Sequence, residues 1–137
     1  MVVLSGGVAG LCAFLFLARD GHSVEALERD SVAVGEPVTS VQWARERVPH
    51  LLQPHAFMPR GRRELRDGLP DVFHTLLRAG ARDVDLRKKL PGAIRREDED
   101  LQYLFVRRPL IEGSCVRRWT KSQTSRFALA FKSRDSA

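Results

Sequence analysis

Residues 1–30 read MVVLSGGVAGLCAFLFLARDGHSVEALERD, and this stretch decides the fold class. Because apolar residues dominate it as far as Ala18, three interpretations compete: a membrane segment, a buried strand–helix–strand unit and a nucleotide-binding turn. A secretory signal has basic residues before its apolar run, and here none precede it. The run is also shorter than the roughly 20 apolar residues of a membrane helix. Ser5, Gly6 and Gly7 near its start favour a turn, so we expect neither a signal peptide nor a membrane span.

The strand–helix–strand interpretation accounts for every part of the stretch. Met1–Leu4 is predicted to be a short strand, buried on both faces of a parallel sheet. Val8–Arg19 has apolar residues at three- and four-residue spacings, which predicts a helix that ends in a left-handed C-cap at Gly21. His22–Leu27 is predicted to be a parallel second strand, joined by a right-handed crossover. The expected fold class is α/β, a partial Rossmann-like βαβ fold with an incomplete parallel sheet.

The turn between the first strand and the helix has the spacing of a dinucleotide-binding fingerprint. That fingerprint is G-x-G-x-x-G, with a carboxylate about 20 residues further on. Gly7 and Gly10 take the second and third glycine places, and Ser5 takes the first. Gly7 lets the backbone approach a pyrophosphate, Gly10 lets the helix pack on the strand, and N–H groups at the helix start bind phosphate. Glu28, after the second strand, is placed to accept hydrogen bonds from ribose hydroxyls.

The same stretch resembles the amino-terminal FAD-binding segment of flavoprotein monooxygenases and related FAD-dependent oxidoreductases, the p-hydroxybenzoate hydroxylase-like proteins. Those proteins typically read G-G-G-x-A-G-L at the turn and L-E-R-D after the second strand. Here the matching stretches are Ser5–Leu11 and Leu27–Asp30. Val48–Ala81 and Val106–Arg118 resemble later segments of the family. In the second of these, Arg108 takes the place of the arginine that reaches the FAD.

The resemblance implies an FAD-binding oxidoreductase of the monooxygenase type, acting on a small organic substrate, with NAD(P)H as the reductant in an intact relative. A glutamate followed by an arginine favours FAD over NAD in this family. The implied cofactor-binding residues lie in the glycine turn, after the second strand and near the last helix: Ser5, Gly6, Gly7, Val8, Ala9, Gly10, Glu28, Arg29 and Arg108. No catalytic residue is assigned, because the flavin itself carries the redox chemistry.

Two features of full-length family members are missing from the chain: a later Gly-Asp motif and a separate sheet that builds the substrate pocket. We therefore expect a truncated flavoprotein that keeps the ADP side of the cofactor site, is not active alone and exposes apolar surface. Residues 1–119 are expected to form a partial FAD-binding domain. Residues 120–137 resemble no part of the family, and they are expected either to pack poorly or to add an edge strand.

The remaining sequence predicts two short helices, a strand at Leu101–Val106 and a final helix. Gly113 and Ser114 are expected to interrupt the pattern of that final helix. Proline and glycine mark where these helices begin and end, at Pro59, Gly68, Pro70, Gly80 and Pro109.

The chain has 137 residues, a net charge of +6 and 43% hydrophobic residues, which fits one domain with a basic surface. Such a charge favours either an anionic partner or a solvated arginine-rich face. Arg60, Arg62 and Arg63 either hold phosphate or form part of such a face. Two alternatives to a flavoprotein stay open. One is an NAD(P)-binding module without flavin, and the other, on charge alone, is a basic nucleic-acid-binding protein, for which no recognition motif is present.

Cysteine and histidine give no signal for a disulfide framework or a metal site. Cys12 and Cys115 are far apart in the sequence, and Cys12 falls in an apolar helical pattern that predicts a small core residue. His50, His55 and His74 are not spaced as metal ligands. A reduced, cytoplasmic setting is expected.

Overall fold

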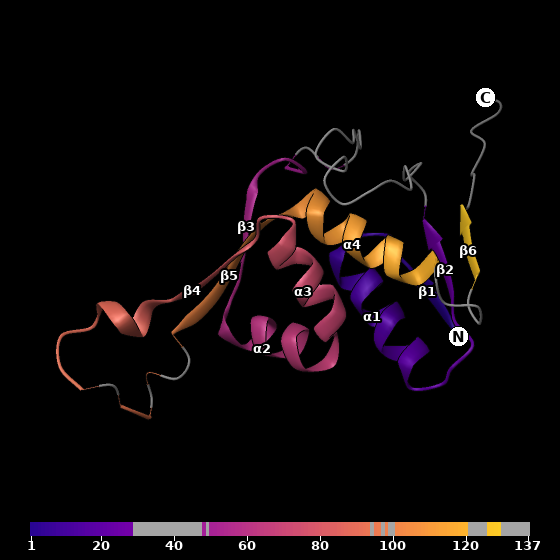
Figure 1. The fold of residues 1–137 in the computed structure, drawn as a ribbon. Helices are drawn as coiled ribbons and strands as arrows, with labels where there is room; N and C mark the ends of the chain where they lie inside the picture. Colours follow the sequence, from indigo (N-terminus) through magenta and orange to yellow (C-terminus); the bar gives the residue numbers. More distant parts are fainter. Residues whose placement is uncertain are drawn as a thin grey trace.

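A computed structural model of the chain describes residues 1–28, 48, 50–93, 95–96, 98, 101–120 and 126–129. Figure 1 shows helices in the middle of the molecule, with one small sheet on each side of them. In chain order the elements are β1 (Val2–Leu4), α1 (Val8–Arg19), β2 (Glu25–Glu28), β3 (Pro54–Phe57), α2 (Pro59–Gly68), α3 (Pro70–Arg78), β4 (Arg82–Asp85), η2 (Leu86–Lys89), β5 (Gln102–Arg107), α4 (Arg108–Thr120) and β6 (Arg126–Leu129).

The predicted βαβ unit is confirmed at the start of the chain. β1 pairs with β2 in parallel, with Val2 opposite Glu25, and α1 connects them. α1 ends as predicted, with Gly21 at φ +86°. The N–H of His22 donates to the carbonyl oxygen of Leu17, which closes a Schellman motif. Because His22 is engaged at the helix end, the second strand begins at Glu25 rather than at His22.

The first sheet has the order β1-β2-β6. β6 pairs in parallel with β2, with Leu27 opposite Ala128. Of the two outcomes expected for the tail, an edge strand is therefore present at residues 126–129. The division of the chain at residue 119 stays a prediction.

The first strand is more exposed than its apolar sequence predicts. Val2 is 58% and Leu4 is 76% exposed, while Val3 packs against the core. The prediction of a strand buried on both faces is therefore wrong. α1 packs against β1 and β2, but Val2 and Leu4 point away from the core. Burying both faces takes a second covering layer, which these two side chains lack among the described residues.

The second sheet is antiparallel, with the order β3-β5-β4. The predicted strand at Leu101–Val106 is confirmed as β5, shifted by one residue. Its side chains alternate, so that Leu104 is fully buried on the helix side while Phe105 is 42% exposed on the other. α2 packs against β5, and the β4–β5 hairpin extends away from the helices (Figure 1).

The core lies where α1, α3 and α4 meet, around fully buried side chains such as Phe14, Leu76 and Ile111. α4 is one continuous helix from Arg108 to Thr120. The expected interruption at Gly113 and Ser114 is therefore wrong. Both residues are buried, and packing of α4 against α1 and α3 outweighs the weak helix propensity of glycine and serine.

Candidate functional site

The glycine turn joins the end of β1 to the start of α1. Gly7 is the N-cap of α1 and has an extended backbone, with φ −79° and ψ 175°. The turn glycines are therefore needed for close approach and not for a positive φ. A Cβ at Gly10 would lie 2.7 Å from the Cβ of Ser5 and would overlap its carbonyl oxygen. Gly10 thus permits the tight contact of strand and helix that its place in the fingerprint requires.

Glu28 lies directly beside this turn. It is the last residue of β2, only 8% exposed, and its carboxylate accepts a hydrogen bond from the N–H of Gly6. A Cβ at Gly6 would lie 2.8 Å from the Cγ of Glu28, so a larger residue does not fit there. The acid and the turn therefore meet at the carboxyl ends of two adjacent parallel strands, which is where open α/β sheets bind ligands.

Arg108 reaches the turn from the other end of the sequence, because it is the first residue of α4. Its Nη2 lies 3.2 Å from the position that a Cβ of Gly7 would occupy. Its Nε donates to Oε1 of Glu112 at 2.7 Å, and Glu112 is fully buried. Nη1 lies 2.8 Å from Nε2 of His50. Because an arginine can only donate, His50 accepts here through Nε2 and carries its proton on Nδ1.

A cavity of about 300 Å³ opens in front of the turn. Its wall is built by three segments: the glycine turn, β3 and the start of α4. The lining residues are Ser5, Gly7, Val8, Ala9, His55, Ala56, Phe57, Arg108 and Ile111.

Five of the residues predicted from the sequence line this cavity, together with four that were not predicted. Gly6 and Gly10 belong to the same turn, with Glu28 behind it, but none of the three lies on the cavity wall. Arg29 lies outside the described residues. For β3 the sequence carried no signal beyond His55 itself.

Glu112 is a further residue that the sequence analysis missed. Its spacing of four residues from Arg108 was the available signal, since such pairs lie on one face of a helix. The pair is nearly buried, with Arg108 at 16% and Glu112 at 0% side-chain exposure. Removal of either partner would leave the other charge uncompensated. The ion pair therefore holds the guanidinium of Arg108 at the turn.

The site has the charge pattern of an anion-binding turn. The first turn of α1 contains no acidic residue, so no side chain there offsets the partial positive charge of the helix N-terminus. The guanidinium of Arg108 adds positive charge above Gly7, partly offset by its ion pair with Glu112. The N–H of Gly7 donates to Oγ of Ser5 at 3.1 Å, so a phosphate would compete with the serine for this group.

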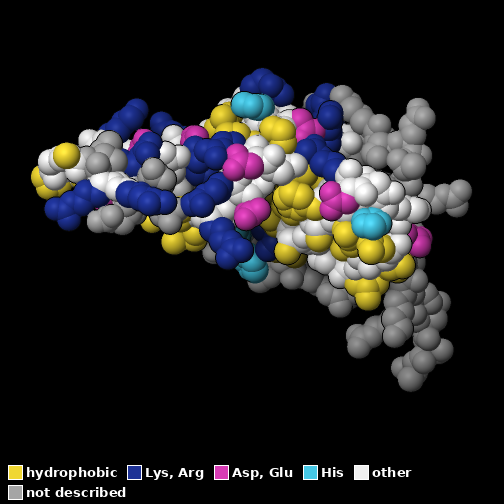
Figure 2. Space-filling model, turned by 90° about the horizontal axis from the view of Figure 1, so that it is seen from below, with side chains coloured by type: hydrophobic (Ala, Val, Ile, Leu, Met, Phe, Trp, Pro, Cys, Tyr) yellow, Lys and Arg dark blue, Asp and Glu magenta, His cyan; other side chains and the backbone are white. Residues whose placement is uncertain are grey.

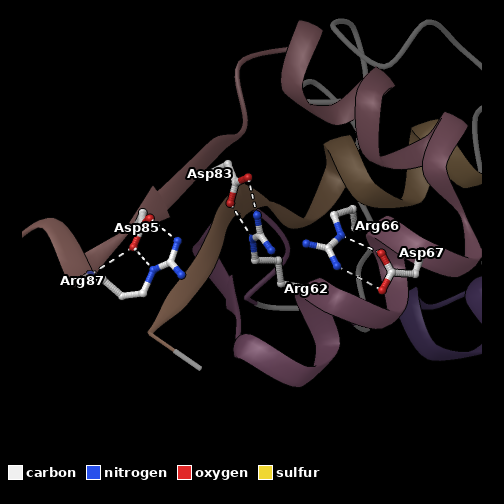
Figure 3. A network of polar contacts seen from close by, with 6 residues as sticks. All are labelled: Arg62, Arg66, Asp67, Asp83, Asp85 and Arg87. Atoms are coloured by element: carbon white, nitrogen blue, oxygen red, sulfur yellow. Dashed lines mark hydrogen bonds and ion pairs between the residues drawn. The ribbon is translucent and has the colours of Figure 1, made fainter. Parts of the chain in front are cut away.

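The fold divides the other predicted arginine cluster, because Arg60 and Arg63 are exposed while Arg62 is buried. Arg62 is 8% exposed and forms two hydrogen bonds of 2.6 Å with the carboxylate of Asp83 (Figure 3). Its guanidinium also stacks 5.7 Å from the ring centre of Phe73. Neither alternative predicted for it, a phosphate ligand or a solvated face, is correct. The partner is an aspartate from β4, and both α2 and β4 contact the strand β5.

Basic side chains are concentrated elsewhere, over the β4–β5 hairpin at the left of Figure 2. Some of this charge is paired, as in the contact of Arg87 with Asp85 at 2.6 Å (Figure 3). Among the described residues, no group of His, Cys, Asp or Glu side chains could hold a metal ion. No helix in this part of the chain is long and apolar enough to cross a membrane.

No protein-family model matches the chain, and no curated protein matches its sequence. Solved structures do match, and the fold they share with the chain is that of one part of FAD-dependent monooxygenases. PqsL of Pseudomonas aeruginosa, described as a probable FAD-dependent monooxygenase, matches with a TM-score of 0.63 and 14% identity over 93% of this chain. p-Nitrophenol 4-monooxygenase PnpA of Pseudomonas putida matches with a TM-score of 0.58 and 17% identity, again over 93% of the chain.

THI4 of Thermovibrio ammonificans also matches, with a TM-score of 0.51 and 18% identity over 92% of the chain. At these identities the likeness establishes the fold. The chain spans about a third of the length of the solved structures it matches: 32% of PqsL, 31% of PnpA and 36% of THI4.

Proposed function

We propose that this chain binds the adenosine diphosphate part of FAD and serves as the ADP side of an FAD-binding oxidoreductase of the monooxygenase type. The glycine turn and Arg108 would hold the pyrophosphate, and Glu28 would hold the ribose. Flavin, when bound, supplies the redox chemistry. The residues of this chain bind and orient the cofactor.

One observation carries the proposal: the guanidinium of Arg108 stands over Gly7 at the start of α1. About a hundred residues separate the two in sequence, yet the fold brings a fixed cation to a helix N-terminus. A pyrophosphate is the group that both features favour, since arginine binds phosphate through paired N–H donors and the helix start offers backbone N–H groups. Glu112 holds Arg108 in this position from the buried side.

The position of Glu28 fits the ribose half of the site. Its carboxylate is already at Gly6, at the edge of the turn where the pyrophosphate would lie. A carboxylate has about four lone-pair positions, so it can accept from a ribose hydroxyl while keeping a backbone partner. Arg29 follows it in the sequence and is proposed as a further contact to the cofactor.

The cavity also fits this assignment. Gly7 has no side chain, which leaves its backbone open to a phosphate. A Cβ at this position would lie 3.2 Å from Arg108 and 3.4 Å from Ser5 and would crowd both side chains. At about 300 Å³ the cavity has room for part of a dinucleotide. Because the chain shares its fold with monooxygenases, the proposal includes a small organic substrate, with NAD(P)H as the reductant. PqsL has been solved in complex with 2-aminobenzoylacetate.

The test is calorimetric titration of the chain with ADP, FAD, NAD and NADP. We expect ADP and FAD to bind more tightly than NADP. Glu28→Ala should weaken binding by on the order of 1–3 kcal/mol, through loss of charge-assisted hydrogen bonds. Arg108→Gln should weaken it by a similar amount, while the matched control Arg107→Gln, at the exposed neighbouring position on β5, should not.

Absence of binding at millimolar ADP would refute the proposal for this chain. An equal loss in Arg107→Gln and Arg108→Gln would show that net charge matters and not the position above Gly7. Tighter binding of NAD than of FAD would support the alternative, a nicotinamide-binding module without flavin.

A further inference from the structure

The helices α1 and α4 lie side by side and run in the same direction (Figure 1). At their starts, Arg108 of α4 stands over Gly7, the N-cap of α1. Toward their ends, Arg19 of α1 and Arg118 of α4 both pair with the carboxylate of Asp71. The fold therefore fixes the two helices against each other at both ends.

Each helix carries one cysteine between these two fixed ends. Cys12 lies five residues after Gly7, and Cys115 lies seven residues after Arg108. At 1.5 Å per residue the two cysteines lie about 7.5 and 10.5 Å along their helices, which is a similar height above the common start. Cys115 belongs to the hydrophobic core, Cys12 packs against that core, and their thiols form a hydrogen bond. The two sulfur atoms therefore face each other across the contact of α1 with α4.

The two thiols differ in their access to solvent. Cys115 is fully buried, whereas Cys12 is only half-buried, so a small oxidant in solution reaches Cys12 first. The hydrogen bond from Cys115 also lowers the pKa of Cys12 and favours its thiolate, which is the reactive form. An accessible thiol with thiolate character beside a second cysteine is the arrangement found at redox-sensitive cysteines.

We propose that Cys12 is an oxidation site for a hydroperoxide, and that Cys115 resolves the oxidised cysteine by forming a disulfide that joins α1 to α4. Both cysteines are free thiols in the structure, which is the reduced form of this pair. The proposal does not depend on cofactor binding at the glycine turn.

The oxidation takes two steps, with hydrogen peroxide as the simplest oxidant. The Cys12 sulfur attacks the O–O bond and takes up one oxygen as a sulfenic acid, and the other oxygen leaves as water. The Cys115 sulfur then attacks the Cys12 sulfur, so that an S–S bond forms and the S–O bond breaks. The hydroxyl group leaves with the proton of the Cys115 thiol as a second water. In sum, the two thiols lose two hydrogens and two electrons, and the peroxide is reduced to two waters.

The test is timed oxidation of the dilute, reduced whole chain with hydrogen peroxide, followed by catalase, N-ethylmaleimide and mass spectrometry. We expect the intact mass to fall by about 2 Da, for the two hydrogens lost, and a peptide that joins Cys12 to Cys115 to appear. Dithiothreitol should reverse both changes. In Cys115→Ser, dimedone should label Cys12 as a sulfenic acid, because the resolving thiol is gone. In Cys12→Ser, oxidation of Cys115 should be at least roughly tenfold slower than in the unmodified chain, because Cys115 is buried.

The matched control moves the thiol by one position, as Cys12→Ala combined with Ala13→Cys. Ala13 is exposed and lies about 100° further round α1, so its thiol should be oxidised without reaching Cys115. Three results would overturn the proposal: equally fast cross-linking in this control, equally fast cross-linking of the chain unfolded in guanidinium, or disulfide-linked dimers as the main product. The guanidinium arm is decisive because closing a long unfolded loop is entropically costly, so only the fold brings these two sulfurs together quickly.

Discussion

The hydroxyl oxygen of Ser5 accepts a hydrogen bond from the backbone N–H of Gly7 at 3.1 Å. This N–H belongs to the helix start that would bind a pyrophosphate, so the serine and the phosphate compete for it. Ser5→Gly removes the competitor, and we expect the affinity for ADP to rise by roughly threefold to tenfold. Calorimetric titration of both proteins measures the change.

Ser5→Ala is the matched control, because it removes the hydroxyl and keeps the Cβ. An equal gain in Ser5→Ala and Ser5→Gly would assign the effect to the hydroxyl group. A weaker affinity in both variants would contradict the prediction, and would mean that the hydroxyl itself donates to the ligand.

Gly10→Ala gives a test of the turn that needs no ligand. An unhindered glycine within a helix gains about 1 kcal/mol of stability on replacement by alanine. At Gly10 the new methyl group would overlap the carbonyl oxygen of Ser5, which is backbone and cannot swing aside. We therefore expect the free energy of unfolding to fall by about 1–3 kcal/mol, as measured by urea denaturation. A gain in stability would contradict the close packing of β1 on α1.

Asp71 ties three helices together, since it lies in α3 and pairs with Arg19 of α1 and Arg118 of α4. Burial raises the pKa of Asp71, but the hydrogen bond from Arg19 and the charges of Arg19 and Arg118 lower it further, so the net shift is downward. A carboxyl with a depressed pKa in the folded state stabilises the protein above its unfolded pKa. That contribution is lost as the pH falls through the folded value.

We expect the free energy of unfolding to decrease between about pH 5 and pH 2, and Asp71→Asn to flatten part of this decrease. Near neutral pH the same variant should cost about 1 kcal/mol. Asp67→Asn is the comparison variant: the hydrogen bond from Arg66 also lowers the pKa of Asp67, but both side chains are exposed, so we expect a smaller flattening (Figure 3). Identical acid profiles for Asp71→Asn and the unmodified chain would contradict the prediction.

Local signals in the sequence were enough to predict most of the elements. Gly21 and Gly80 end α1 and α3 at positive φ, as only glycine does readily, and Pro59 and Pro70 begin α2 and α3. The glycine turn was also predictable, because its spacing follows from the close approach of β1 and α1.

Relationships between distant segments were not predictable in the same way. Arg62 belongs to a basic run, and its partner Asp83 can be identified only when β4 is paired with β5, the strand that α2 contacts. The wall of the cavity from β3 likewise depends on the pairing of β3 with β5. Val2 and Leu4 are apolar and yet exposed, so their hydropathy predicted burial where the fold provides none.

The contact between the two cysteines likewise joins distant segments and was not predictable from the sequence. Cys12 on α1 and Cys115 on α4 are 103 positions apart, yet their thiols form a hydrogen bond in the fold. This bond lowers the pKa of the Cys12 thiol, although burial opposes the shift. The bond and complete burial both raise the pKa of Cys115 well above its usual range. Because the thiolate is the reactive form, Cys12 should be alkylated by iodoacetamide at least roughly tenfold faster than Cys115.

Peptide mass mapping after timed alkylation measures both rates. Cys115 should react only after the chain is unfolded in guanidinium, since it is fully buried. Cys115→Ser keeps a hydroxyl donor beside Cys12 and should preserve the rate at Cys12, whereas Cys115→Ala removes the donor and should slow it by about threefold. If Cys115→Ala left the rate unchanged, exposure alone would explain the reactivity of Cys12. Equal labelling of both cysteines in the folded chain would contradict the packing of α1 against α4 that also holds Arg108 over the glycine turn.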